Sequence, residues 1–341
     1  MKRREFLKSL GYAAAVSLAS ESITVATPTA AWSQTAEKMR RLGVLFFSGL
    51  SSNPVVPPGL QALVDALREH GWEEGRNVAF EVRYAGPDPA RLLELAADLV
   101  ELKVDAILID DTQALEAARR KTTTIPIIMT GQGVTVGMGF IESLARPGGN
   151  ITGIVNQIET TDEKNFELFK EIKPGIERVG IIYSPDNIAS LANFKLAKEQ
   201  TAPRLGLIGV PIPVSKPGDL DEAFATIVRE GVQGLAVHPT SVIVAQRARI
   251  AAFAIERRLP TIVGIHVMAR DGLLMCYGFD NTVSWRRAAS YVDRILKGAN
   301  PAELPVEQLD RFQLIINMKT ARAMGLDLPP ALVTRADEII E

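Results

Sequence analysis

Short apolar runs alternate with amphipathic segments along most of the chain. The runs 41–47, 104–109 and 179–183 are nearly continuously apolar, which is typical of parallel strands buried on both faces. Residues 58–69 instead repeat Leu and Val at helical spacing. Strand and helix patterns that alternate in this way predict an α/β protein with doubly wound parallel sheets.

The alternation falls into two series. Expected strands are 41–47, 77–84, 104–109, 125–129 and 151–155, followed by 179–183, 207–214, 234–237, 261–263 and 272–277. Expected helices are 58–69, 88–99, 112–121 and 139–145, followed by 162–172, 187–201, 219–229, 241–257 and 284–297. A chain of 341 residues is longer than a single hydrophobic core usually supports. We therefore expect two α/β lobes joined by a hinge.

The N-terminus reads as a removable export signal. A basic start, Lys2-Arg3-Arg4, precedes an apolar run at 10–25 and a small-residue zone that ends near Ser33. We therefore predict a signal peptide over 1–33 and a periplasmic location. The arginine pair resembles a twin-arginine signal, but Lys2 stands where Ser or Thr usually precedes it, so a Sec route stays open.

Charge and cysteine content narrow the class of partner. The net charge is −2, and removing residues 1–33 takes away four Lys/Arg and two Glu, which leaves a mildly acidic protein. Such a protein offers no electrostatic footprint for nucleic acid. Cys276 is the single cysteine, so the chain has no intrachain disulfide. Because no cysteine lies near Ser33, we expect no lipid anchor there.

Candidate ligand contacts follow the strands, because open parallel sheets bind ligands outside the carboxyl ends of their strands. Hydroxyl and small residues at these positions suit a carboxylate, and acids suit an ammonium group. The predicted ligand-binding residues are Ser48, Gly49, Asp111, Thr112, Gly131, Gln132, Tyr183, Asp186, His238, Thr240, His266, Tyr277 and Asp280.

Signals for catalysis are weak. Gly131-x-Gly133-x-x-x-Gly137 does not have dinucleotide-binding spacing, and no phosphate loop or Gly-x-Ser-x-Gly elbow occurs. Cys276 lies in an apolar strand, and His238 and His266 lack close acidic neighbours for a metal. We expect no catalytic residue, cofactor or metal. The alternative is a two-lobed α/β enzyme that uses His238 or His266 as acid and base.

Several motifs resemble one known family. They are Gly71-Trp-Glu-Glu-Gly-Arg-Asn-Val78, Ser143-Leu-Ala-Arg-Pro-Gly-Gly-Asn-Ile-Thr-Gly153, Pro185-Asp-Asn187, Arg287 to Ala299, Leu304 to Gln308 and Asn317 to Ala321. From about residue 40 to the end, the chain is similar to ABC-transporter substrate-binding proteins, a family with tryptophan- and tyrosine-binding members. The resemblance implies a type I periplasmic-binding-protein fold with three hinge crossings and a ligand between the lobes.

The resemblance also implies a domain organisation and partners. Lobe 1 is expected over 36–156 plus most of 281–341, and lobe 2 over 157–280. The expected role is to capture a small polar or amphipathic solute, an amino acid or related carboxylate, for an ABC permease in the inner membrane, with the protein a monomer. A sensor would share the fold, but a DNA-binding helix-turn-helix would then be expected at the N-terminus. We expect Trp285 near the rim of the ligand cleft.

Overall fold

Alternate residues of the first apolar run face opposite sides of a parallel sheet. In β1 (Arg40–Phe46), Val44 and Phe46 belong to one cluster of buried side chains, whereas Leu45 and the following Phe47 belong to another. All four side chains are buried. The run is continuously apolar because both faces of its strand are covered, as the sequence predicts.

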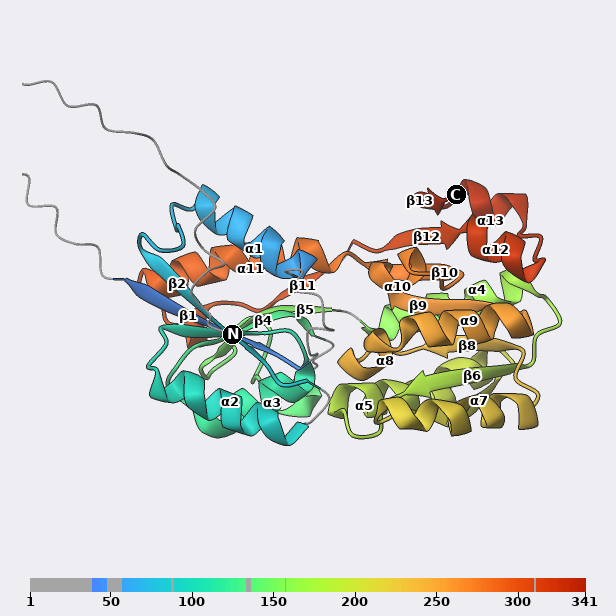
Figure 1. The fold of residues 1–341 in the computed structure, drawn as a ribbon, viewed down its shortest axis with the longest axis horizontal. Coiled ribbons are helices and arrows are strands. Elements are labelled where there is room, and N and C mark those ends of the chain that lie inside the picture. The colour runs from blue at the N-terminus through green and yellow to red at the C-terminus, as the bar shows by residue number, and fades with distance from the viewer. Residues whose placement is uncertain (1–38, 48–56, 87–88, 133–135, 157, 310) are drawn as a thin grey trace, which may run out of the picture. The chain divides into compact units, whose positions relative to one another are not determined.

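The computed structural model describes residues 39–47, 57–86, 89–132, 136–156, 158–309 and 311–341 (Figure 1). The predicted signal peptide, 1–33, lies outside these residues. None of the described helices combines the length and the apolar character needed to cross a lipid bilayer.

The first lobe is built on a six-stranded sheet whose paired strands are all parallel. Its order is β11-β5-β4-β3-β1-β2. Besides β1, the strands are β2 (Val78–Tyr84), β3 (Ala106–Ile109), β4 (Ile127–Gln132), β5 (Ile151–Asn156) and β11 (Glu307–Leu309). Helices α1 (Pro58–Glu69) and α11 (Asn281–Leu296) pack together on one face, and α2 (Pro89–Glu101) and α3 (Thr112–Lys121) on the other (Figure 1).

The second lobe is built on a seven-stranded sheet of order β13-β12-β10-β9-β8-β6-β7. Its strands are β6 (Arg178–Tyr183), β7 (Ile208–Pro213), β8 (Gly234–Val237), β9 (Thr261–Ile265), β10 (Met275–Phe279), β12 (Gln313–Asn317) and β13 (Glu338–Ile340). All pairs are parallel except β10 with β12. The predicted fold class, two doubly wound α/β lobes, is therefore confirmed.

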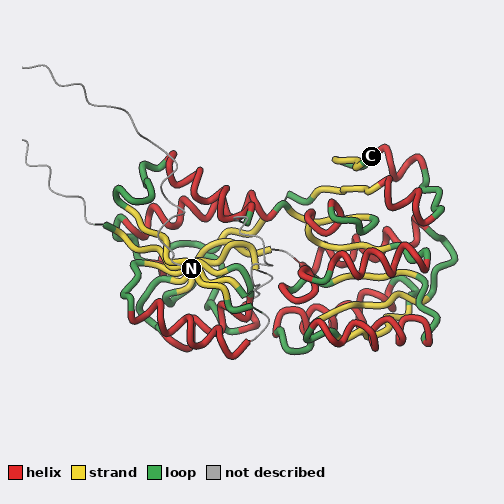
Figure 2. The backbone as a smooth tube through the Cα atoms, in the orientation of Figure 1, coloured by secondary structure: helices red, strands yellow, loops and turns green. Residues whose placement is uncertain are grey.

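Helices lie on either side of the strands in this lobe too (Figure 2). They are α4 (Ile158–Ile172), α5 (Ile188–Leu196), the π-helix η2 (Ala197–Thr201), α6 (Ala202–Arg204), α7 (Leu220–Arg229), α8 (Ser241–Ala245), α9 (Arg247–Arg257), α10 (His266–Arg270), α12 (Met318–Met324) and α13 (Pro330–Thr334). The short 3₁₀ turns are η1 (Val136–Met138) and η4 (Pro301–Glu303) in the first lobe, and η3 (Pro217–Asp219) in the second.

The chain passes between the two sheets at three places: between β5 and α4, between β10 and α11, and between β11 and β12. The last crossing corrects the expected boundary. We assigned most of 281–341 to the first lobe, but only 281–309 packs there, and β12 and β13 extend the second sheet. Strand β12 joins this sheet because β10 offers it an antiparallel partner.

Two helix predictions also differ from the structure. The segment 241–257 is two helices, because the backbone of Gln246 leaves helical geometry and ends α8. No helix forms over 139–145. The SLARPGGN motif there makes a turn, in which the Ser143 hydroxyl accepts from Arg146 N at 3.0 Å. Short polar turns of this kind hold their backbone through local side-chain bonds rather than through a helical ladder.

Candidate functional site

The cap of α3 connects residues from both lobes. Asp111 follows β3, and its carboxyl Oδ1 accepts from Gln113 N at 2.7 Å, which is a standard N-cap. The same Oδ1 accepts from Asn187 Nδ2 at 3.2 Å, and Oδ2 accepts from Ser241 Oγ at 3.3 Å. Asn187 and Ser241 belong to the second lobe, so the sequence-predicted Asp111 lies where the two lobes touch.

A second group of polar side chains surrounds the end of β5. The Asn156 amide donates to the carbonyl oxygen of Gly131 on β4, and its Oδ1 has no hydrogen bond within the described structure. Gly131 has φ +109°, and a Cβ there would lie 2.9 Å from Ser284 Oγ and 3.4 Å from Asn156 Oδ1. Ser284 on α11 is fully buried, and its hydroxyl is also without a partner there. Glycine is required because both the backbone geometry and the space exclude a side chain.

A third group lies six residues further along, on the second-lobe side of the crossing. Asp162 and Asn165 are three residues apart on α4 and therefore share one face. Asp162 Oδ2 is 3.2 Å from Nε2 of His238, which follows β8, and both side chains are 8% exposed. Asp162 Oδ2, Asn165 Oδ1 and both ring nitrogens of His238 form no hydrogen bonds with described residues. Buried polar atoms without protein partners are rare, so this group is a candidate for contact with a bound molecule.

His266 is separate from this group. It begins α10, is buried, and its Nε2 lies 3.3 Å from the carbonyl oxygen of Gly278. Burial lowers the pKa of His266, and the contact with Gly278 only partly opposes this. A neutral ring must therefore donate from Nε2, because a carbonyl only accepts, which leaves Nδ1 as an acceptor.

Aromatic side chains stack at the carboxyl ends of β1, β2 and β6. Phe46 lies between Tyr84 and Trp285, with ring centroids 4.9 and 5.4 Å away. Trp285 is only 5% exposed, so our expectation of a tryptophan at a cleft rim is wrong: it is packed between Phe46 and α1. In the second lobe, Tyr183 stacks on Phe194 at 3.7 Å, and burial raises the pKa of its hydroxyl.

The other predicted residues have diverse positions. Thr240 and Asp280 cap α8 and α11, and Asp280 Oδ1 accepts from Thr282 N at 2.8 Å. Thr112 is the buried first residue of α3, and Tyr277 is half-buried against Phe312. Asp186 is exposed and offers its carbonyl oxygen to Gln113 Nε2 at 3.3 Å. Ser48, Gly49 and the side chain of Gln132 lie outside what the structure describes.

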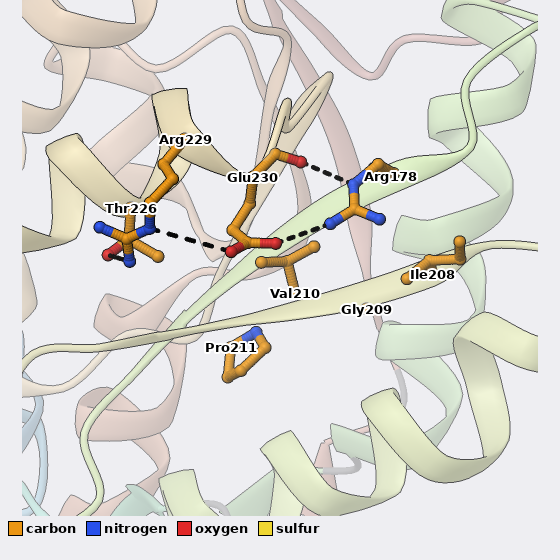
Figure 3. Close-up of a pocket in the computed structure, with 8 residues that line it drawn as sticks. All are labelled: Arg178, Ile208, Gly209, Val210, Pro211, Thr226, Arg229 and Glu230. Carbon is orange, nitrogen blue, oxygen red and sulfur yellow. Dashed lines mark hydrogen bonds and ion pairs between the residues drawn. The ribbon is translucent and has the colours of Figure 1, made fainter.

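One pocket of about 410 Å³ lies at the other end of the strands (Figure 3). Arg178 and Ile208, which line it, begin β6 and β7, so the pocket lies toward the amino ends of parallel strands. Its Arg178 is already paired: Nη2 lies 2.9 Å from Glu230 Oε2, and Nε donates to Glu230 O at 2.6 Å. Position and charge both argue against a ligand site there.

Sequence reasoning did not single out Asn156, Asp162, Asn165 or Ser284. A signal existed for Asn156, which directly follows the apolar run 151–155, as the predicted residues follow their strands. Asp162 and Asn165 were expected only as the start of a helix. No metal site emerges: the described residues contain no group of three or more His, Cys, Asp or Glu that could hold an ion.

Comparison with known proteins identifies the family. The family model of ABC transporter substrate-binding proteins matches residues 52–340. The chain belongs to this family. A tyrosine-binding protein of Clostridioides difficile is 26% identical over 290 residues, which cover 85% of this chain and 82% of that protein.

Solved structures of this substrate-binding fold agree. A conserved domain protein from Vibrio cholerae has 26% identity and a TM-score of 0.82 over 88% of this chain and 99% of its own. A domain from Streptococcus pneumoniae in complex with L-Trp has 22% identity and a TM-score of 0.81 over the same shares. The resemblance stated from the sequence motifs is confirmed.

Proposed function

We propose that this substrate-binding protein serves an ABC importer and captures a small solute with an ammonium group, such as an amino acid, between its lobes. The family supports a solute-binding role. The tyrosine-binding relative and the structure with L-Trp support an amino acid in particular. The unpaired polar atoms near the crossing from β5 to α4 support the ammonium group.

The main supporting observation is a set of three buried oxygens that form no hydrogen bond with described residues, although one of them, Asp162 Oδ2, lies 3.2 Å from His238 Nε2. They are Asn156 Oδ1, Asp162 Oδ2 and Asn165 Oδ1. Each unpaired buried acceptor costs about 1–3 kcal/mol, so a ligand that supplies donors binds with a corresponding gain. An ammonium group carries three N–H donors and no acceptor. The chemistry of the three oxygens therefore matches an ammonium better than a carboxylate.

Chain connectivity limits how far apart these three residues lie. Asn156 ends β5, and Asp162 lies on the second turn of α4. They are six positions apart, four of these within α4, so their Cα atoms lie at most about 13 Å apart. Asn165 follows one turn later on the same helix face. A small solute is long enough to contact side chains on both sides of this crossing.

A carboxylate has its own candidate partners nearby. The Ser284 hydroxyl is buried without a partner in the described structure and lies in the first turn of α11, a helix of 16 residues. Asp280 already accepts from Thr282 N at this helix start, so the Ser284 hydroxyl is the donor left for an anion there. Ser284 is also next to Gly131, which contacts Asn156. An amino acid could thus offer its carboxylate to Ser284 and its ammonium to the three oxygens.

Calorimetric titration with matched analogues tests this assignment. L-Tryptophan and L-tyrosine are compared with indole-3-propionate and 3-(4-hydroxyphenyl)propionate, which lack the ammonium group. If an amino acid binds, its analogue should bind about ten- to a hundredfold more weakly, because the three oxygens then receive no ammonium donors. An analogue that binds as tightly as its parent amino acid would refute the ammonium assignment.

The enzyme alternative has one specific observation in its favour, the contact between Asp162 and His238. A carboxyl beside an imidazole is the arrangement that general acid–base catalysis uses. A binding protein must return its solute unchanged. Incubating the identified solute with the protein and analysing it by NMR separates the two functions, since a new product would establish catalysis.

Export and delivery complete the proposal. The protein would leave the cytoplasm by the signal over 1–33 and deliver its solute, as a monomer, to a permease in the inner membrane. Replacing Arg3 and Arg4 by Lys should retain the precursor in the cytoplasm if the twin-arginine pathway exports it. Cell fractionation measures the amount of protein in the periplasm. If the variant and the wild type have equal amounts there, export is assigned to the Sec route.

A further inference from the structure

The side chain of Asp111 contacts helix N-termini in both lobes. It caps α3 of the first lobe through Gln113 N. Asn187, whose amide donates to Asp111, itself caps α5 of the second lobe by accepting from Ser190 N at 2.9 Å. Ser241, whose hydroxyl donates to Asp111, is the first residue of α8. One carboxyl group thus connects three helix starts.

A second contact lies beside it. Gln113, on the first turn of α3, donates from Nε2 to the carbonyl oxygen of Asp186 at 3.3 Å. Asp186 directly precedes Asn187. Two adjacent turns, one in each lobe, are therefore joined by side chains from both sides, and α3 also packs against α5.

The contacts of Asp111 are buried. Asp111 is 8% exposed and Asn187 3% exposed. Burial raises the pKa of Asp111, and the bonds from Gln113 N and Ser241 oppose this shift. A carboxylate in such a place is stabilised by its donors, and hydrogen bonds to charged groups are stronger than neutral ones. Both of its oxygens are engaged, so its groups are satisfied without a ligand.

We propose that Asp111 is a clasp that holds the two lobes together, so that the protein itself supplies part of the free energy of closure. A hinge opening would break its bonds to Asn187 and Ser241 but leave the cap to Gln113 N intact, because that bond lies within the first lobe. This role rests on the proposed function, in which a solute binds between the lobes. It assigns Asp111 to the equilibrium between open and closed states rather than to direct contact with the solute.

The test separates the clasp from the cap. Asp111→Ser keeps a good N-cap residue for α3 but is too short to reach the second lobe. Asn187→Ser does the same from the other side for α5. Asn300→Ser is the matched control, because Asn300 caps η4 through Ala302 N within the first lobe. Comparable thermal unfolding of all four proteins ensures that closure, not folding, is compared.

The readout is the distance between spin labels at Thr123→Cys and Ala252→Cys, both on exposed positions of different lobes. The native Cys276 is buried and should not react. In ligand-free protein, Asp111→Ser and Asn187→Ser should each lower the closed-to-open ratio about tenfold, and Asn300→Ser should not change it. An unchanged distance distribution in Asp111→Ser and Asn187→Ser would overturn the clasp. Because no ligand is needed, the result does not depend on the identity of the solute.

Discussion

Asp162 on α4 and His238 after β8 face each other with Oδ2 and Nε2 3.2 Å apart, although they are 76 residues apart in the chain. Their alignment does not make a hydrogen bond, and neither atom forms one with any other described residue. Such a pair at the carboxyl end of a parallel strand is well placed to receive a ligand.

Asn165 should matter for binding rather than for folding. Its Oδ1 has no partner in the described structure, so Asn165→Ala should weaken binding of the solute about tenfold and leave the melting temperature nearly unchanged. Calorimetry and thermal unfolding provide the two values.

Asn150→Ala is the matched control. The Asn150 amide donates to Thr122 O at 3.3 Å and to Ile125 O at 2.7 Å, so its loss should lower stability by about 1–2 kcal/mol without changing affinity. If the Asn165 variant is destabilised while its affinity is retained, Asn165 is a structural residue.

Gly131 should tolerate no side chain. Its φ of +109° and the 2.9 Å approach of a Cβ to Ser284 Oγ predict that Gly131→Ala loses about 1–3 kcal/mol of unfolding free energy. Gly149→Ala is the control, because a Cβ there meets nothing within 4 Å. Urea unfolding compares the variants, and equal stabilities would show that the strand end adapts to a methyl group.

Asp293 should make stability depend on pH. Burial alone would raise its pKa, but donors from Lys297 and from Trp72 Nε1, at 2.9 Å, outweigh burial and lower it. A lowered folded-state pKa means that this stabilisation is complete above the ordinary value of 3.8 and is lost as the pH falls through the folded value.

Removing the Trp72 donor tests this relationship. Trp72→Phe should reduce the difference in unfolding free energy between pH 7 and pH 3, and Asp293→Asn should reduce it further. Urea unfolding at both pH values provides these differences. If both variants keep the wild-type difference, other carboxyl groups determine the acid sensitivity.

Two prolines should keep strand β7 from pairing with another molecule. Ile208 N donates to Glu177 O, just before β6, at 2.7 Å, and Val214 N donates to Tyr183 O in β6 at 2.8 Å. The backbone groups of residues 209, 211 and 213 therefore point outward from this edge strand. Pro211 and Pro213 have no N–H to offer there. Prolines of this kind are a known protection of sheet edges.

Replacing both prolines by Thr should restore two outward donors and promote self-association of a protein that we expect to be monomeric. Pro217→Ala, in the η3 turn, is the control. Sedimentation velocity over a range of concentrations measures the effect. A double variant that stays monomeric like the control would show that the edge is protected by something other than its missing donors.

The sequence predicted the architecture well because its strands are buried on both faces and its helices are amphipathic. The helix 112–121 was expected with the bounds that the structure has, since Asp111 is a strong cap and Thr122 ends the helix in extended geometry. The break at Gln246 was missed, because apolar spacing continues across it. The final strand β13 was missed because it is short and half-exposed, and β12, although mostly buried, was not assigned either.

The candidate site was harder to predict because it depends on contacts across the fold. Asp111 was named as a ligand contact, but its bonds come from residues 76 and 130 positions away, which no local pattern reveals. Asp162 and Asn165 look like ordinary residues of an early helix turn. Only the burial of α4 against the second sheet shows that their oxygens lack partners.

Native mass spectrometry of the protein isolated without denaturation from the cells that make it tests the central claim most directly. We predict a single extra mass that corresponds to one small solute with an ammonium group, and its loss from a variant with Asp162→Ala and Asn165→Ala. Retention of the solute by this variant, or a bound solute without an amine, would contradict the account.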